Sequence, residues 1–189
     1  MSEKIDIFPY APRYFDEVLK LANEAFGENY MTSRQLSVFV GSESSFYIAE
    51  SDGRLAGYCI FIHETPGETA KHMDRVIRLF PKACEPDTKV CYTKSMAIAG
   101  EYKSKGIAKK LFGRCLAESV AAGMQIAWGS AWKIGEIVPM KPIFDNEGFS
   151  AIGEVPLAWY DNEEYMCLHC GGRCKCGAVI YYKELCAEK

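Results

Sequence analysis

The chain has 189 residues, of which 49% are hydrophobic and 25% are charged, and its formal net charge is -3. This length and composition predict one folded domain spanning residues 1–189, and they exclude a disordered tail. The acidic balance argues against nucleic acid as a partner, because binding it needs a basic surface. No apolar run reaches the roughly 18 residues of a membrane span, and residues 1–6 are too polar for a secretory signal peptide. We therefore expect a cytoplasmic protein that binds no membrane.

Periodic patterns of apolar residues predict helices and strands along the whole chain. In chain order, the expected elements are a strand at 5–8, helices at 13–26 and 32–39, strands at 45–50 and 55–62, a helical patch at 73–80, a strand at 90–99, a helix at 106–122, a strand at 124–131, a short helix at 139–146, and strands at 151–160 and 178–183. Asp52-Gly53 between two apolar runs is a strong hairpin signal. This order of elements predicts a mixed α/β fold.

The segment from Ser95 to Phe112 is the most informative part of the sequence. It reads as a buried strand, a short polar loop with two lysines, and an amphipathic helix that begins at Gly106. The first backbone amides of a helix lack partners, and the positive end of the helix dipole favours anions at the same place. The segment therefore predicts a site for a phosphate-bearing cofactor. An ordinary strand-loop-helix connection with solvated lysines is the alternative.

This loop resembles the acyl-CoA-binding motif of the Gcn5-related N-acetyltransferase (GNAT) family. The family motif is [Q/R]-x-x-G-x-[G/A], and the corresponding residues here are Lys103-Ser104-Lys105-Gly106-Ile107-Ala108, with lysine in place of the usual glutamine or arginine. Gly148-Phe149 is similar to the residues that follow the family's last helix, and the order of expected elements from Ile5 to Leu185 also matches. The resemblance implies a GNAT-like, mostly antiparallel sheet flanked by helices.

The resemblance also implies an activity, that of an acetyl-CoA-dependent N-acetyltransferase. In this family of acyltransferases an amine attacks the thioester directly in a ternary complex. The acceptor would be a primary amine on a small molecule or a peptide. Strand backbone at Met96, Ala97 and Ile98 would contact the pantetheine arm and the acyl group. The residues implied for the pyrophosphate are those of the motif, Lys103, Ser104, Lys105, Gly106, Ile107 and Ala108.

The catalytic residues stay unassigned, because two groups that many family members use have no counterpart here. Where those members carry a glutamate on the strand before the loop, this chain has Thr93-Lys94-Ser95. The tyrosine that many members use as an acid corresponds to Phe144. The groups that could still act, each with an equally ordinary role in packing or at the surface, are Tyr92, Glu136, Asp145 and Tyr160.

Several other residues near this region have two interpretations. Trp132 either walls an acceptor pocket or packs in the core or at an interface, and packing is favoured. The 73–80 segment either covers the acceptor site or packs on the sheet, and packing is again favoured. His63 and His72 are isolated in the sequence, and we interpret both as structural or exposed.

Four of the nine cysteines crowd into ten residues, at Cys167, Cys170, Cys174 and Cys176. Thiolates at this spacing suit a tetrahedral zinc ion, and a site with four protein thiolates leaves no open position for catalysis. We therefore expect a structural Zn²⁺ in an insertion over 163–177, between the last two strands. His169 in place of one cysteine, an iron–sulfur cluster, disulfides and free thiols are the alternatives.

Two classes of function remain open after the sequence alone. The leading one is an N-acetyltransferase that uses acetyl-CoA and acts on a primary amine of unknown identity. The alternative is a non-catalytic GNAT-like module that binds CoA or a partner protein through the metal-stapled hairpin. A homodimer is also left open.

Overall fold

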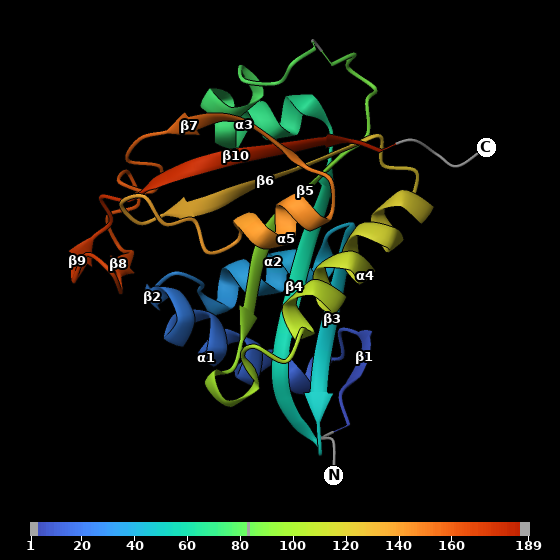
Figure 1. Cartoon of the computed structure of the whole chain (residues 1–189), viewed down its shortest axis with the longest axis vertical. Helices are drawn as coiled ribbons and strands as arrows, with labels where there is room; N and C mark the ends of the chain where they lie inside the picture. Colours follow the sequence, from blue (N-terminus) through green and yellow to red (C-terminus); the bar gives the residue numbers. More distant parts are fainter. Residues whose placement is uncertain (1–3, 83, 186–189) are drawn as a thin grey trace.

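A computed structural model describes residues 4–82 and 84–185, and it contains one large sheet with helices on both faces (Figure 1). The sheet has seven strands in the order β1-β3-β4-β5-β6-β10-β7. Their bounds are β1 Asp6–Pro9, β3 Ser44–Ser51, β4 Arg54–Glu64, β5 Val90–Ile98, β6 Ile126–Lys133, β7 Ser150–Val155 and β10 Gly177–Glu184. Every pair is antiparallel except β5–β6. The predicted GNAT-like fold class is confirmed.

Helices cover both faces of this sheet because its strands alternate their apolar side chains between the two faces. The helices are α1 Phe15–Phe26, α2 Ser33–Gly41, α3 Pro66–Ile77, α4 Ile107–Ala121 and α5 Lys141–Asn146. On β3, Tyr47 and Ala49 pack in the cluster that contains α4 and α5, whereas Phe46 and Ile48 pack with α1 and α2. Val76 of α3 packs on β6 and β10 in a third cluster. No helix in the described part of the chain is long and apolar enough to cross a membrane.

A second, three-stranded sheet was not expected from the sequence. It consists of β2 (Gly27–Glu28), β8 (Met166–Cys167) and β9 (Gly172–Arg173), in that order. It pairs the residues just after α1 with the cysteine-rich segment. A side chain at Gly27 would clash with the backbone of Met166, so the close approach of these two segments requires glycine. Strands of two residues carry no periodic signal, which is why the sequence did not predict them.

The observed elements differ from the expected ones in the 73–80 and 151–160 regions. The expected helical patch at 73–80 belongs to α3, which begins at Pro66 and ends at Ile77. Its first turn is set by a capping box, in which Thr65 and Glu68 satisfy each other's backbone amides. The expected strand at 151–160 ends at Val155, because residues 156–160 turn toward the cysteine-rich segment.

The two central strands β5 and β6 separate partway along their length, and this separation positions the site. Their parallel pairing runs only from Val90↔Ile126 to Thr93↔Gly129. Beyond that point β5 stays bonded to β4 as far as Ile98, while β6 stays bonded to β10. Figure 1 shows the arrowheads of β5 and β6 pointing in different directions. One edge of β5 therefore faces an opening in the middle of the sheet.

Candidate functional site

The opening between β5 and β6 holds a cavity of about 310 Å³. One wall is β5 over residues 92–96, and another is β6, which contributes Trp128, Ser130 and Trp132. Five other regions complete the lining: the end of α1 with the connection to α2, α2 itself, α3, residues 140–144 and residues 159–165. Residues far apart in the chain therefore meet around one space in the centre of the molecule.

Eight of the 18 residues that line the cavity are phenylalanine, tyrosine or tryptophan. Tyr92 stacks on Trp128 with ring centroids 4.9 Å apart, and Phe26 lies against Tyr30 at 4.3 Å. Phe144 also lines the cavity, where its ring is held by stacking on a tyrosine of β10 at 4.4 Å. The side chain at this position has no ionisable group. The cavity is therefore suited to a ligand with a flat apolar part.

Three polar atoms in the cavity wall lack partners. The described part of the chain has four buried side-chain polar atoms without a hydrogen-bond partner. Three of them, Thr93 Oγ1, Trp128 Nε1 and Trp132 Nε1, belong to residues that line the cavity. An unpaired buried donor costs roughly 1–3 kcal/mol, so Thr93 Oγ1 and Trp128 Nε1 favour a ligand with acceptors.

A chain of hydroxyl groups joins the cavity to the core. The Tyr30 hydroxyl donates to Ser95 Oγ at 3.2 Å, and Ser95 Oγ lies 2.7 Å from the Tyr58 hydroxyl. Burial raises the pKa of Tyr30 and raises that of Tyr58 well above its ordinary value. Both phenols therefore stay protonated at neutral pH and can act as donors, but not as bases.

His72 of α3 lines the same cavity, and its imidazole is paired with a carboxylate. His72 Nε2 lies 2.9 Å from Glu64 Oε2, and the side chain of Glu64 is only 6% exposed. The Thr69 hydroxyl donates to the other carboxylate oxygen. The imidazole also lies against Tyr92, with ring centroids 5.5 Å apart. The ring is exposed, as expected, and its pairing with Glu64 was not indicated by the sequence.

The four residues considered as catalytic groups have different surroundings. Of Tyr92, Glu136, Asp145 and Tyr160, only Tyr92 lines the cavity. Asp145 accepts from Lys141 at 2.6 Å, and the ring of Tyr160 lies under an arginine guanidinium at 4.0 Å. Glu136 is exposed. Trp132 packs against the cysteine-rich segment and also lines the cavity.

Lys94 lies in the 93–95 segment of β5, in which the sequence has no carboxylate. It lines the cavity, and its ammonium group lies 5.0 Å from the centre of the Phe39 ring. Burial lowers the pKa of this lysine, and the charge of Glu64 partly opposes that shift. The site therefore has one cation on β5 and one carboxylate at the end of the neighbouring strand β4.

The predicted cofactor loop leads from the end of β5 into α4. Gly106 is the N-cap of α4 with φ 75°, and no side chain caps the helix. The first-turn amides, including those of Ile107 and Ala108, thus have no intrahelical acceptor. Among the described residues no heavy atom lies within 4 Å of a Cβ added at Gly106, so the positive φ, rather than crowding, favours glycine here.

The other predicted cofactor residues extend from this loop to the cavity. Lys103 and Ser104 are exposed, and Lys105 places its ammonium 5.1 Å from the ring centre of Tyr102. Met96 lines the cavity, and Ala97 and Ile98 continue β5 toward the loop. The cavity and the open helix start are therefore connected along one strand.

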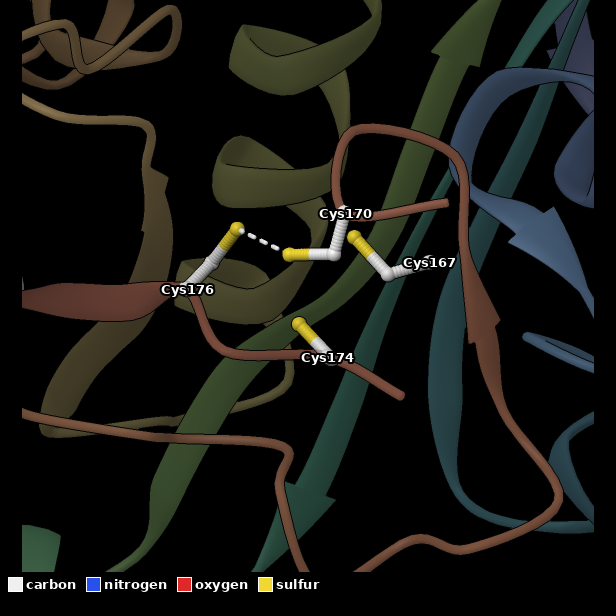
Figure 2. Close-up of side chains that lie close together, drawn as sticks. All are labelled: Cys167, Cys170, Cys174 and Cys176. Atoms are coloured by element: carbon white, nitrogen blue, oxygen red, sulfur yellow. Dashed lines mark hydrogen bonds between the residues drawn. The ribbon is translucent and has the colours of Figure 1, made fainter. Parts of the chain in front are cut away.

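The four clustered cysteines converge in space. Their sulfur atoms all lie within 4.8 Å of one another (Figure 2). The Sγ atoms of Cys170 and Cys176 are 3.6 Å apart, much farther than the roughly 2.0 Å of a disulfide. Sulfurs bound to a tetrahedral zinc ion at about 2.3 Å lie about 3.8 Å from one another. The arrangement therefore fits a tetrahedral metal ion, and His169 is not part of the group.

The surroundings of the four thiols supply donors for thiolate ligands. The Lys175 amide donates to Cys170 Sγ at 3.3 Å. The unpartnered Trp132 Nε1–H lies beside Cys176. Burial raises the pKa of the Cys176 thiol to about 11, so a bound cation would be needed to keep it ionised at neutral pH. Arg173, which lies between two of the cysteines in sequence, pairs with Glu163 at 3.4 Å.

Comparison with known proteins identifies the class to which this fold and site belong. The profile described as the acetyltransferase (GNAT) family matches residues 15–131, well over half of the chain. The chain therefore belongs to the GNAT family and is an acyltransferase of the N-acetyltransferase type. No curated protein sequence gives a match.

Solved structures share the fold at low sequence identity. Arabidopsis thaliana NAA60 in complex with acetyl-CoA has a TM-score of 0.73 and 13% identity, over 96% of this chain and 99% of that one. The ribosomal-protein-S18-alanine N-acetyltransferase of Escherichia coli has a TM-score of 0.69 and 9% identity, over 98% and 97%. An N-acetyltransferase from Staphylococcus aureus Mu50 has a TM-score of 0.67 and 13% identity, over 97% and 99%. At these identities the likeness shows a common fold.

Proposed function

We propose that this protein transfers the acetyl group of acetyl-CoA to a primary amine held in the aromatic cavity. The observation that carries this proposal is the opening between β5 and β6, which joins the cavity to the uncapped start of α4. One arrangement thus offers an anion site, an exposed strand edge and an enclosed space for an acceptor. The complex of Arabidopsis NAA60 with acetyl-CoA, which has the same fold, supports the same donor here.

The residues between the loop and the cavity would hold acetyl-CoA. First-turn amides at Ile107 and Ala108, together with Lys103 and the rest of the 103–108 loop, suit a pyrophosphate. The edge of β5 from Met96 to Ile98 would pair with the amide groups of the pantetheine arm. Bound in this way, acetyl-CoA supplies an activated acyl carbon next to the cavity.

The acceptor we propose is a primary amine on a flat apolar group, either in a small molecule or at the end of a peptide. The stacked rings of Tyr92 and Trp128 provide an apolar surface for such a group. The side chain of Phe144 cannot protonate the departing thiolate. A thiol with a pKa of about 8.5 is mostly protonated at pH 7, so its departure as a thiolate without an acid costs about 2 kcal/mol. Positioning of two bound reactants lowers the reaction barrier by more than this cost.

Thermal shift measurements with acetyl-CoA test the binding part of the proposal. We expect acetyl-CoA to raise the melting temperature of the wild type but not of Gly106→Glu, because a carboxylate at the helix start repels the pyrophosphate. Gly53→Glu is the matched control, since Gly53 has φ 76° and equally open surroundings in the β3–β4 turn. If Gly106→Glu responds like the wild type, the loop assignment is wrong.

Product analysis tests the transfer itself. Purified protein is incubated with acetyl-CoA and either 2-phenylethylamine or the tripeptide phenylalanyl-glycyl-glycine. The acetylated product is detected by mass spectrometry, because thiol reagents would react with the protein's own cysteines. Acetyl-CoA binding without product from either probe would instead favour the non-catalytic CoA-binding module.

We also propose that Cys167, Cys170, Cys174 and Cys176 hold a structural Zn²⁺. The convergence of their sulfurs and the nearby N–H donors support this assignment. Four thiolate ligands leave no open position, so the ion would stabilise the loop and take no part in acyl transfer. Metal analysis of the purified protein is expected to give one zinc per chain, and iron with visible absorbance would contradict it.

A further inference from the structure

The pairing of Glu64 with His72 at the cavity has no role in the function proposed so far. Glu64 is the last residue of β4, and His72 lies two turns into α3. The two are joined at 2.9 Å, and Thr69 holds the second oxygen of the buried carboxylate. We propose that His72 accepts the proton of the acceptor amine and that Glu64 positions its ring. This inference rests on the proposed acetyl transfer.

The hydrogen bond to Glu64 determines which ring nitrogen is free. An ionised carboxylate only accepts hydrogen bonds, so Nε2 of a neutral His72 must carry the proton. Nδ1 then holds the lone pair, as a general base requires.

The path of α3 brings this base into the cavity wall. Successive residues of a regular helix point about 100° apart, so they do not normally face the same space. Met73 departs from helical conformation with φ -141° and ψ 48°, and both His72 and Met73 line the cavity. The imidazole lies against Tyr92 of β5, and Thr93 and Lys94 are the next two residues of that strand. It lines the same cavity as Met96, where the strand edge that would hold acetyl-CoA begins.

The proton balance of the reaction gives this base a defined task. The amine nitrogen bonds to the thioester carbonyl carbon, and the carbon–sulfur bond breaks with its electron pair going to sulfur. The proton of the amine passes to His72 Nδ1, directly or through one water molecule, and is then returned to the thiolate. The products are the amide and the free thiol, and no other reactant is needed.

The titratable neighbours of His72 come from three elements. They are Glu64 of β4, Glu68 of its own helix, and Tyr92 with Lys94 on β5. Glu68 is engaged in the capping box with Thr65, so Glu64 is the carboxylate that pairs with the ring. Glu68→Gln is therefore a matched control for Glu64→Gln, because glutamine also serves in a capping box.

Steady-state kinetics with 2-phenylethylamine over a range of pH tests the assignment. We expect His72→Gln to lower kcat/KM about 100-fold at neutral pH, in the range typical of general-base catalysis. The ratio of wild-type to variant rate should shrink at acidic pH, because a protonated imidazole has no lone pair. Glu64→Gln should lose about tenfold, and Glu68→Gln should stay within about twofold of the wild type.

Two further measurements do not depend on turnover. Nitrogen-15 NMR of the imidazole is expected to show the Nε2-protonated form, and the acetyl-CoA thermal shift should be unchanged in His72→Gln. A wild-type-like rate and pH profile in His72→Gln, or an Nδ1-protonated ring, would overturn the base assignment and leave the proposed function standing. Loss of both activity and the acetyl-CoA thermal shift in His72→Gln would indicate a structural role for His72 and would also overturn the base assignment. Absence of product from wild-type protein would overturn both proposals.

Discussion

At the scale of single residues, the three histidines show how surroundings decide the role of one side chain. His63 Nε2 lies 3.0 Å from Ser45 Oγ and 3.0 Å from Ser119 Oγ in a half-buried network, in agreement with the structural role expected for it. His72 faces the cavity with a carboxylate behind it. The ring of His169 packs edge-on against Trp132 beside the cysteine cluster. Of the three, only His72 combines a place in the wall of the central cavity with a hydrogen-bonded carboxylate.

His63 should make the stability of the fold depend on pH. Burial lowers its pKa below the ordinary value of 6.5, although the charges of Glu43 and Glu118 oppose the shift. The unfolded chain therefore binds the proton first as the pH falls, and the free energy of unfolding decreases from about pH 6.5 downward until His63 is also protonated in the folded state. Urea unfolding at pH 7.5, 6.5 and 5.5 should show a smaller loss for His63→Gln than for the wild type. Equal losses in the two proteins would contradict this.

At the scale of elements, helix α3 carries the residue on which the proposed proton transfer depends. It is joined to β4 by the Glu64–His72 pair and to the sheet by Val76, which is buried among β6 and β10 residues. Its start at Thr65 is fixed by hydrogen bonds in both directions of the capping box. The orientation of His72 thus depends on local bonds at the start of the helix as well as on packing near its end.

Substitution at this cap should weaken the fold by a measurable amount. Thr65→Ala removes the hydroxyl that accepts from the Glu68 amide, so we expect the free energy of unfolding to fall by about 1 kcal/mol. Thr65→Ser keeps the hydroxyl and should remain within about 0.5 kcal/mol of the wild type. Chemical denaturation of the three proteins gives the comparison. Equal stability of Thr65→Ala and the wild type would show that the box contributes nothing.

At the scale of the whole molecule, the cysteine-rich segment holds one wall of the cavity. The Tyr165 hydroxyl donates to the carbonyl of Phe26 at 2.9 Å, and Asn29 Nδ2 donates to the carbonyl of Glu164 at 3.1 Å. Together with the β2–β8 pairing, these bonds join the segment to the α1–α2 connection. Phe26 and Tyr165 both line the cavity, so a metal ion in the cluster would support the place where the acceptor is proposed to bind.

Loss of one proposed zinc ligand should therefore affect the acceptor more than the donor. Cys174→Ser is expected to abolish stoichiometric zinc and to raise KM for 2-phenylethylamine several-fold, with little change in the acetyl-CoA thermal shift. Cys84→Ser is the matched control, because Cys84 is a free thiol in the connection from α3 to β5, outside the cluster. Zinc retained in Cys174→Ser, or zinc lost equally in both variants, would contradict the assignment.

The sequence by itself determined the features that depend on neighbouring residues. Alternation of apolar side chains predicted the main strands, and the Asp52-Gly53 turn, where φ is 49° and 76°, was predicted correctly from residue type. The start of α4 at Gly106 and the convergence of four closely spaced cysteines were also predicted, since each lies within a few residues of chain. The family resemblance rested on the same short segments, and the match over residues 15–131 confirms it.

Only the tertiary structure decided how the site is built. The cavity combines Phe26, His72, Trp128 and Tyr165, and no local pattern indicates that residues so far apart will meet. The Glu64–His72 pair spans the end of a strand and the second turn of a helix, so the sequence showed two unrelated residues. The separation of β5 from β6 depends on which strands each pairs with on its other side. Such contacts are set by the packing of the whole chain, which is why motif and periodicity predicted the donor site but not the proposed base.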